Sequence, residues 1–240
     1  MGFSSMKKID NNEKDELLPE YDLTRLRVRK FGPAREHFPG HGIITPVGKF
    51  MRQMQMFNER KVAQMAAFYL GQVPECRMSH LKLMKLLYLA DRGAVRAFGF
   101  TMSGDRMVSM PHGPVLSMTL NLMDGDVESG VGGWEEWISD KENHELSLRQ
   151  PLRVESLDEL SPAEIEVLTA VWSTFGPMDK WEIRDWTHHH CAEWEDPRGS
   201  SYPISFERLA LALGFNGSVV SELAARFQEE QEIDRLFAAL

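Results

Sequence analysis

The chain has 240 residues, and its 27 lysine and arginine residues against 36 aspartate and glutamate residues give a formal net charge of −9 at pH 7. Hydrophobic residues make up 42% of the sequence, which is enough for a packed core and excludes a chain that is disordered throughout. The acidic balance disfavours a general nucleic-acid-binding protein, because such a protein needs a basic face to displace counterions from phosphates.

The cysteines and the N-terminus indicate where the protein works. The two cysteines, Cys76 and Cys191, cannot form a disulfide framework, which favours a reducing compartment. The first ten residues contain lysines but no apolar stretch follows them, unlike in a signal peptide. No apolar run approaches the roughly 18 residues that span a bilayer. We therefore expect a cytoplasmic protein that has no membrane partner.

Residues 1–55 differ in composition from the rest of the chain. An acidic block around residues 10–22 is followed by a basic block around residues 25–35, with repeated glycine and proline and few apolar residues. This composition predicts a flexible N-terminal segment, because it can bury little surface. Two interpretations stay open: a flexible leader without a binding role, or an element that becomes ordered when it binds a partner. In the second interpretation, the residues that bind the partner are Leu17, Leu18, Tyr21 and Leu23.

The next part of the chain predicts two helices and a hairpin. Apolar residues at a period near 3.6 predict a helix over about residues 58–71. The following helix, about residues 79–98, is apolar nearly all round, which is typical of a central helix covered by others. Around Ser103-Gly104-Asp105 the apolar period changes to two, which predicts a short hairpin over residues 101–110. Pro114 fits the first turn of the next helix.

The second half of the chain predicts further helices with clear start signals. A second, short hairpin is expected over residues 137–148, with its turn near residues 140–143. Capping boxes at Ser161-Glu164 and Asp179-Glu182 predict the starts of two helices. A short helix capped by Ser205 and a final helix from about residue 218 complete the chain.

These elements together predict a mainly α fold. We expect a compact helical domain of about seven helices with one or two short β-hairpins over residues 56–240. A largely irregular N-terminal segment over residues 1–55 precedes it, as a possible partner-binding element.

Four consecutive residues could suggest a metal site: His188, His189, His190 and Cys191. Neighbouring residues on a helix point in different directions, so these four cannot all reach one ion. A mixed site that also uses His112, His80 or Cys76 stays open.

Other catalytic signals are weak. Cys191 with a histidine and Asp185 or Glu193 could form a nucleophilic site, but no family-type motif surrounds the cysteine. The sequence has no Walker loop, dinucleotide fingerprint, nucleophile elbow or zincin motif. We therefore expect a protein that is not an enzyme and needs no cofactor or metal.

The helices predicted over residues 161–175 and 179–190 could form a helix-turn-helix. The second helix would be the recognition helix, and its charges cancel: Lys180 and Arg184 against Glu182 and Asp185. DNA readers usually bring arginine, asparagine or glutamine to base edges. The pattern favours structural helix packing over direct DNA binding.

Three segments together resemble one family. Residues 82–91, KLMKLLYLAD, are similar to the central helix signature of the Panacea domain of SocA-like antitoxins and phage GepA-like proteins. Residues 112–115, HGPV, resemble its second signature, although His112 stands where an aromatic residue is common. Trp186-Thr187-His188 followed by Trp194 resembles a late element of the family, with Glu193-Trp194 in place of the usual Pro-Trp. The resemblance covers about residues 56–235.

The resemblance implies an antitoxin that neutralises a cognate toxin protein by direct binding, without chemistry of its own. One alternative is a proteolytic adaptor that delivers the toxin to a protease. A second alternative, from another class, is a metal-dependent hydrolase that uses His188 or His190 with Cys191. The candidate partner contacts in the domain are Lys82, Lys85, Tyr88, His112, Gly113 and Pro114. Lys82 and Tyr88 could equally bond inside the domain, and Gly113-Pro114 could simply shape the start of a helix.

Overall fold

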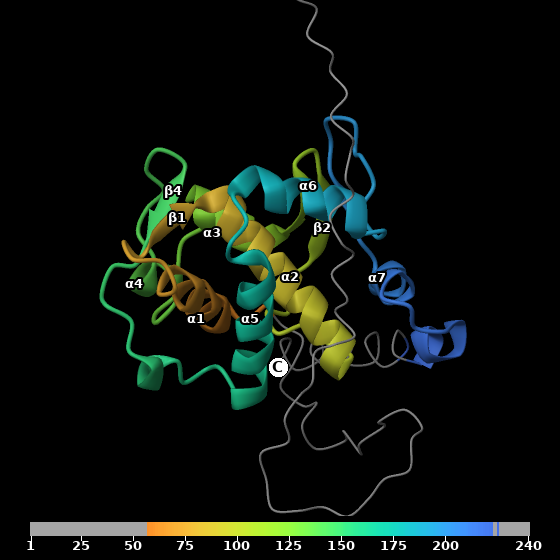
Figure 1. The fold of residues 1–240 in the computed structure, drawn as a ribbon, viewed down its shortest axis with the longest axis horizontal. Coiled ribbons are helices and arrows are strands. Elements are labelled where there is room, and N and C mark those ends of the chain that lie inside the picture. The colour runs from red at the N-terminus through yellow and green to blue at the C-terminus, as the bar shows by residue number, and fades with distance from the viewer. Residues whose placement is uncertain (1–56, 223–224, 226–240) are drawn as a thin grey trace, which may run out of the picture.

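The computed structural model describes residues 57–222 and 225, and it is built around one central helix (Figure 1). Helix α2 (His80–Phe98) is buried continuously from Leu83 to Val95. It packs against α1 (Glu59–Leu70), α5 (Pro162–Phe175) and α6 (Lys180–His190). This arrangement confirms the central helix that the nearly continuous apolar run predicts.

Local capping determines where the surrounding helices begin. The side chain of Asn58 accepts a hydrogen bond from a backbone N–H in the first turn of α1. Ser161 and Glu164 form a complete capping box at α5, and Asp179 and Glu182 form another at α6. These contacts satisfy N–H groups that have no partner within the helix. Both helix starts predicted from the capping boxes are therefore confirmed.

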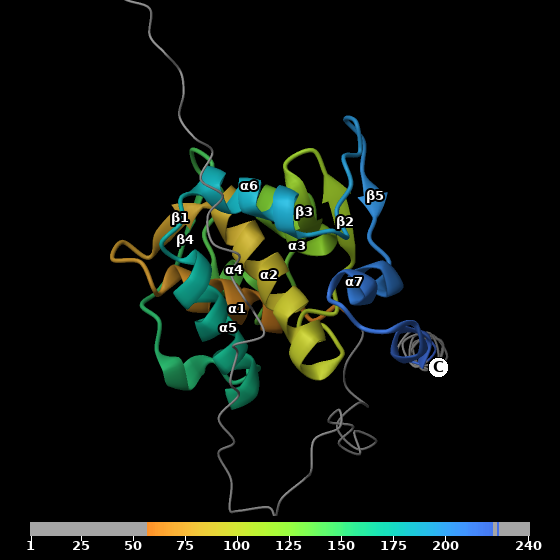
Figure 2. The same ribbon diagram turned by 45° about the vertical axis from the view of Figure 1, so that its right-hand side comes forward.

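Two small antiparallel sheets flank the helices. In the larger sheet, β2 (Met107–Met110) lies between β3 (Gly113–Leu116) and β5 (Tyr202–Pro203). In the smaller sheet, β1 (Arg77–Ser79) pairs with β4 (Glu145–Ser147). Strand β3 contacts α6, and Figure 2 shows this strand beside one end of the helix.

The hairpin predicted around Ser103-Gly104-Asp105 is wrong in its position. Strands β2 and β3 pair Met110 with Gly113, so the chain turns at residues 111–112 instead. Ser103 and Asp105 are buried, and their polar groups bond to α2 and α3 as described below. Short polar residues favour both turns and helix caps, so the sequence pattern alone does not separate the two.

The prediction for Pro114 is also wrong, because this residue does not begin a helix. It lies in β3, and α3 (Ser117–Asp124) begins three residues later. Strand β3 is at the edge of its sheet, where a residue without an N–H is tolerated.

The predicted chain reversal near residues 140–143 is confirmed by two isolated bridges. Ile138 pairs with Leu148, and Glu142 pairs with Glu145. A short helix, α4 (Trp134–Trp137), precedes this reversal.

The remaining elements complete a mainly α fold with short strand pairs, as predicted. The 3₁₀ helix η3 (Val154–Ser156) precedes α5, and α7 (Phe206–Ala212) begins at the predicted cap, Ser205. The segment of residues 1–55 that we expect to be irregular lies outside the described residues. Within residues 57–222 and 225, none of the helices combines the length and the hydropathy that a membrane crossing requires.

Candidate functional site

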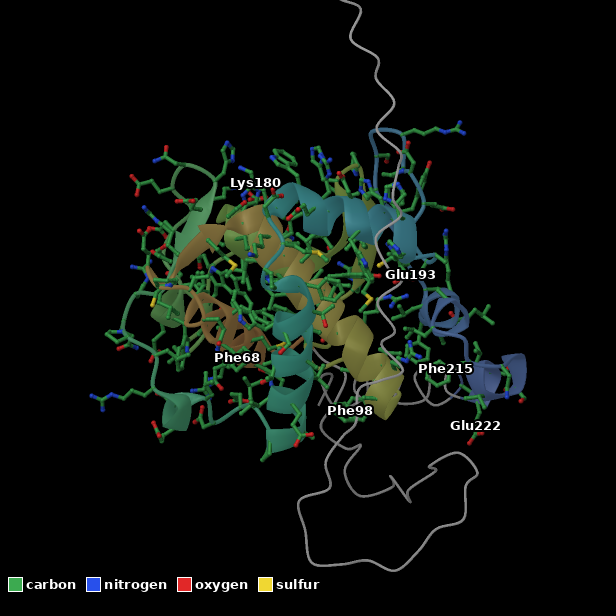
Figure 3. All side chains as sticks on the ribbon, viewed as in Figure 1. Phe68, Phe98, Lys180, Glu193, Phe215 and Glu222 are labelled. Atoms are coloured by element: carbon green, nitrogen blue, oxygen red, sulfur yellow. The ribbon has the colours of Figure 1, made fainter. Side chains whose placement is uncertain are left out.

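The three sequence motifs meet in space. Helix α2 contacts both β3 and α6, and β3 contacts α6. The ribbon shows α6 crossing α2 beside the β2–β3 hairpin (Figure 2). Lys180 lies at the start of α6 and Glu193 lies beyond its far end (Figure 3). We call the contact region of these three motifs the motif junction, and we define it by Lys85, Tyr88, Gly113, Thr187 and Glu193.

Lys85 connects the first motif to the second. Its side chain is fully buried, and its Nζ donates a hydrogen bond to the Pro114 carbonyl oxygen at 2.7 Å. Burial lowers the pKa of Lys85 to about 7, because a charged amine is poorly solvated there. This value already includes two smaller effects: the neighbouring Cys191 raises the pKa of Lys85, and the Arg184 charge lowers it.

Gly113 allows this close approach. Its φ of +91° lies in the left-handed region, a backbone conformation that residues other than glycine rarely adopt. A Cβ at this position would lie 2.9 Å from the Lys85 Nζ and 2.9 Å from the Thr187 Oγ1. The glycine of the second motif is therefore required both by the backbone conformation and by the space around it.

A buried hydrogen bond and a buried ion pair connect helix α2 to the third motif. The Tyr88 hydroxyl donates to the Glu193 Oε1 at 2.5 Å, and the Arg92 Nε donates to the same oxygen at 2.6 Å. A second Arg92 nitrogen lies 3.3 Å from the other carboxylate oxygen. The side chain of Glu193 is fully buried, and that of Arg92 is nearly so. Glu193, which departs from the family pattern, is thus bonded on both oxygens.

Trp194 and His188 hold the segment after α6 against the hairpin. Their rings stack at a centroid distance of 4.3 Å, with 9° between the ring planes. The Trp194 Nε1 donates to the Met110 carbonyl oxygen at 3.0 Å. The His188 Nε2 is buried without a hydrogen-bond partner, and burial with the nearby Lys85 and Arg184 charges lowers the pKa of this imidazole.

Asp91, the last residue of the first motif, fixes the loop that follows α2. Its carboxylate accepts hydrogen bonds from the backbone N–H groups of Met102 at 2.8 Å and Ser103 at 3.0 Å, and from the Ser103 hydroxyl. Burial raises the pKa of Asp91 to about 6, although these hydrogen bonds act in the opposite direction. Asp105 continues the network, because it accepts from the N–H and hydroxyl groups of Thr119 in α3.

The predicted contact residues fall into four groups. Lys85, Tyr88, Gly113 and Pro114 are buried in the motif junction. Lys82 is half-buried, and its Nζ donates to the Gly176 carbonyl oxygen at 2.7 Å. His112 is exposed at the turn of the hairpin. The leader residues Leu17, Leu18, Tyr21 and Leu23 lie outside the described residues, and partner contact by any of the ten stays a prediction.

The structure adds Arg92, Asp91 and Thr187 to this region, and none of them is among the predicted site residues. Asp91 and Thr187 stand within the quoted motifs, so the resemblance offered a signal for both. Arg92 follows directly after the first motif, and its partner Glu193 is 101 residues away. No local pattern could have indicated that pair.

The histidine and cysteine cluster spreads in different directions, as its helical position predicts. The His189 Nδ1 lies 2.7 Å from the Asp185 carbonyl oxygen, and the His190 ring stacks on Trp186. Burial raises the pKa of the Cys191 thiol, and the nearby Glu193 carboxylate raises it further. This disfavours the thiolate that a nucleophile needs. Within the described part of the chain, no group of three or more histidine, cysteine, aspartate or glutamate residues is placed to hold a metal ion.

A comparison with protein families identifies this region. Residues 83–195 match the family model described as "Antitoxin SocA-like, Panacea domain". Residues 83–195 are a SocA-like Panacea domain. The match extends from Leu83, in the first motif, to Glu195, directly after Trp194. No curated protein and no solved structure matches the chain.

The buried amine in this Panacea domain predicts a pH dependence of stability. The folded pKa of Lys85, about 7, lies below the ordinary 10.5, so between these values the unfolded chain binds more protons. Stability therefore rises with pH over this window, by up to about 1.4 kcal/mol per pH unit. Below pH 7 Lys85 is protonated in both the folded and the unfolded state, so its contribution to the free energy of unfolding no longer changes with pH. Urea unfolding of wild type and Lys85→Met from pH 6 to 10 should show this extra slope in wild type alone.

Lys180→Met is the matched control for this experiment, because Lys180 is exposed at the start of α6. It should keep the wild-type profile. Parallel profiles for wild type and Lys85→Met would show that the buried amine does not titrate in this window.

Proposed function

We propose that the protein is an antitoxin that neutralises a cognate toxin protein by direct, non-covalent binding. The observation that carries this proposal is the SocA-like Panacea match over residues 83–195. The three motifs that resemble this family meet in a closed, hydrogen-bonded junction. In this proposal the junction is a rigid scaffold, and the exposed surface around it contacts the toxin.

The charge of the domain supports a basic partner. Residues 57–222 contain 15 lysine and arginine residues against 25 aspartate and glutamate residues, so their net charge is 15 − 25 = −10. Opposite charge on a partner increases the rate of association and favours it over acidic competitors. We infer that the toxin presents a basic surface to this domain.

Trp181, at the start of α6, is the contact residue that the surface favours most. It is 48% exposed, and Lys180 and Arg184 both lie over its ring, at 5.2 and 4.8 Å from the centroid. Tryptophan and arginine are enriched among the residues that dominate binding energy. The two cations also hold the ring in place, so less side-chain freedom is lost on binding.

Trp181→Ala should therefore weaken toxin binding at least tenfold, as measured by titration calorimetry, and leave thermal stability close to that of wild type. A tenfold change corresponds to about 1.4 kcal/mol, which is within the range for such residues. The matched control is Tyr202→Ala in β5, because Tyr202 is an aromatic residue with similar exposure, 46%. Equal affinity of wild type and Trp181→Ala would remove Trp181 from the contact surface.

Co-expression tests the function itself. A toxin that arrests growth when expressed alone should be harmless together with this protein, and its lifetime should be unchanged. Rescue accompanied by a shorter toxin lifetime would instead indicate the adaptor, which delivers the toxin to a protease. Continued growth arrest with a toxin that binds this protein would contradict the proposal.

A further inference from the structure

The buried amine of Lys85 has fewer hydrogen-bond acceptors than its charged form needs. Its Nζ donates to the Pro114 carbonyl oxygen at 2.7 Å, and this is its only hydrogen bond within residues 57–222 and 225. An ammonium group has three N–H donors, and a buried donor without an acceptor is costly. Protonation of Lys85 therefore leaves N–H groups without acceptors in the closed motif junction.

The charges around the amine also disfavour its protonation. The titratable and charged groups that face it come from α6 and its C-terminal cap: Arg184, His188 and Cys191. The Arg184 charge repels an ammonium group at Lys85, and a protonated His188 would do the same. Burial raises the pKa of the Cys191 thiol, so this thiol stays neutral near pH 7. Strand β3, the other neighbour, has the sequence GPVL and contains no titratable side chain.

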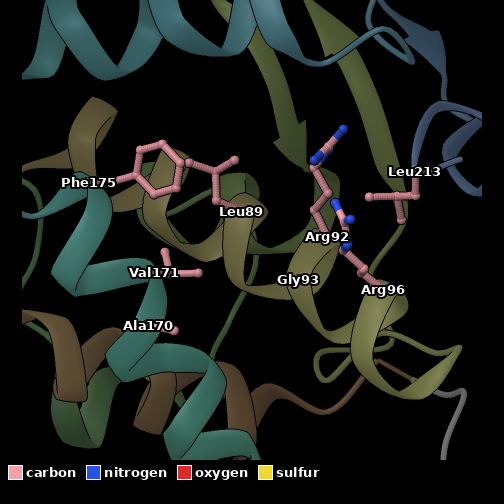
Figure 4. Close-up of a pocket in the computed structure, with 8 residues that line it drawn as sticks. All are labelled: Leu89, Arg92, Gly93, Arg96, Ala170, Val171, Phe175 and Leu213. Atoms are coloured by element: carbon pink, nitrogen blue, oxygen red, sulfur yellow. The ribbon is translucent and has the colours of Figure 1, made fainter. Parts of the chain in front are cut away.

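Neither the buried carboxylate nor the small hollow of the domain serves this amine. Glu193 is already paired with Arg92. The hollow lies between α2 and α5, and Leu89 and Val171 are among its lining residues, whereas Lys85 is not (Figure 4). Within the described part of the chain, a charged Lys85 therefore meets no counterion in the closed junction.

The stacked rings of His188 and Trp194 lie beside the amine at the surface of the domain. A Cβ on Gly113 would be 2.9 Å from the Lys85 Nζ and 3.0 Å from the His188 Cδ2, so the imidazole is a close neighbour of the amine. Lys85 is fully buried, whereas His188 and Trp194 are half-buried. A hydrogen bond of 3.0 Å from the Trp194 Nε1 to the Met110 carbonyl oxygen connects the rings to β2. We call His188 and Trp194 the ring lid.

We propose that protonation of Lys85 opens the ring lid, so that water reaches the ammonium group and the end of α6 separates from the β2–β3 hairpin. Displacement of the two rings exposes the amine without breaking the buried pair of Arg92 and Glu193. The ring lid is then a pH-sensitive device in the domain. It does not depend on the identity of the toxin, so it is tested on the free full-length protein.

The opening should become more frequent as the pH falls towards 7. The pKa of Lys85 is about 7 in the closed junction, against an ordinary value of 10.5 that applies when the amine is solvated. Between these values the open state binds more protons, so each unit of lower pH favours opening by up to about tenfold. From pH 9 to pH 7 the equilibrium constant for opening should rise about 50-fold. Below pH 7 Lys85 contributes no further change.

Exchange of the Trp194 indole N–H with heavy water, followed by NMR, measures this opening. The indole of Trp181, which is 48% exposed, gives the rate without protection at each pH. The protection of Trp194 relative to Trp181 should fall about 50-fold from pH 9 to pH 7 in wild type, and it should stay constant in Lys85→Met. Lys82→Met, one turn earlier on α2, is the matched control and should keep the wild-type change.

Urea separates the opening of the ring lid from unfolding of the whole domain. Met65 in α1 is fully buried, so its amide N–H reports on unfolding. Up to 1 M urea, the protection of the Trp194 indole should stay constant while that of the Met65 amide falls. These wild-type measurements test the proposal even if Lys85→Met fails to fold. Trp194 protection that is independent of pH in wild type, that changes equally in Lys85→Met, or that falls with urea in parallel with Met65 would overturn the proposal.

Discussion

Glu193→Ala is expected to lower the free energy of unfolding by about 3–5 kcal/mol, the usual cost when one partner of a buried ion pair is removed. The substitution leaves the Arg92 guanidinium without its carboxylate in a nearly fully buried position. It also removes the acceptor of the buried Tyr88 hydroxyl. Urea unfolding at pH 7, followed by circular dichroism, measures the loss.

Two further variants separate the charge from the shape of Glu193. Glu193→Gln keeps an acceptor oxygen for Tyr88 but loses the charge, so its loss should be smaller than that of Glu193→Ala. In the double variant Arg92→Met, Glu193→Leu no unpaired charge remains, so it should be more stable than Glu193→Ala alone. If the losses of the single variants Arg92→Met and Glu193→Leu simply added up in the double variant, the pair would not act as a unit and our account of the motif junction would be wrong.

Gly113→Ala should be nearly as damaging, with a loss of about 2–5 kcal/mol. The left-handed backbone at φ +91° accounts for about 1–2 kcal/mol once a Cβ is present. The Cβ would also meet the Lys85 Nζ and the Thr187 Oγ1 at 2.9 Å, and such overpacking costs a further 1–3 kcal/mol, roughly. Denaturant unfolding and the near-ultraviolet circular dichroism of the surrounding aromatic residues report on this change.

Gly125→Ala is the matched control for Gly113→Ala. Gly125 also has a positive φ, +76°, but a Cβ added there would have no atom within 4 Å. This variant should show the backbone cost alone, about 1–2 kcal/mol. Equal losses in the two variants would mean that the close approach of the motifs at Gly113 contributes nothing to stability.

Local signals predicted the helices well and the strands poorly. The starts of α5 and α6 follow from capping boxes that involve residues three apart, so a single sequence contains the whole signal. The hairpin was misplaced because Ser103 and Asp105 look like turn residues but serve as partners for Asp91 and Thr119. Those contacts join residues 12 and 14 positions apart in different elements. The spacing of apolar residues within one element does not indicate them.

The site was predictable only in part, for a related reason. The resemblance indicated Lys85, Tyr88 and Gly113, yet it did not show that these residues are buried and bond to one another. The pairing of Arg92 with Glu193 joins residues 101 positions apart, so it depends on how α6 crosses α2. A sequence pattern that describes one helix at a time cannot predict how two helices cross.

Affinity purification of the tagged full-length protein from its native cells tests the central claim most directly, with mass spectrometry of the proteins that elute with it. The account predicts one stoichiometric partner with a basic surface, which is toxic when expressed alone and harmless when expressed with this protein. A stoichiometric partner that is harmless when expressed alone, or a toxic partner that remains toxic in the complex, would contradict the antitoxin function.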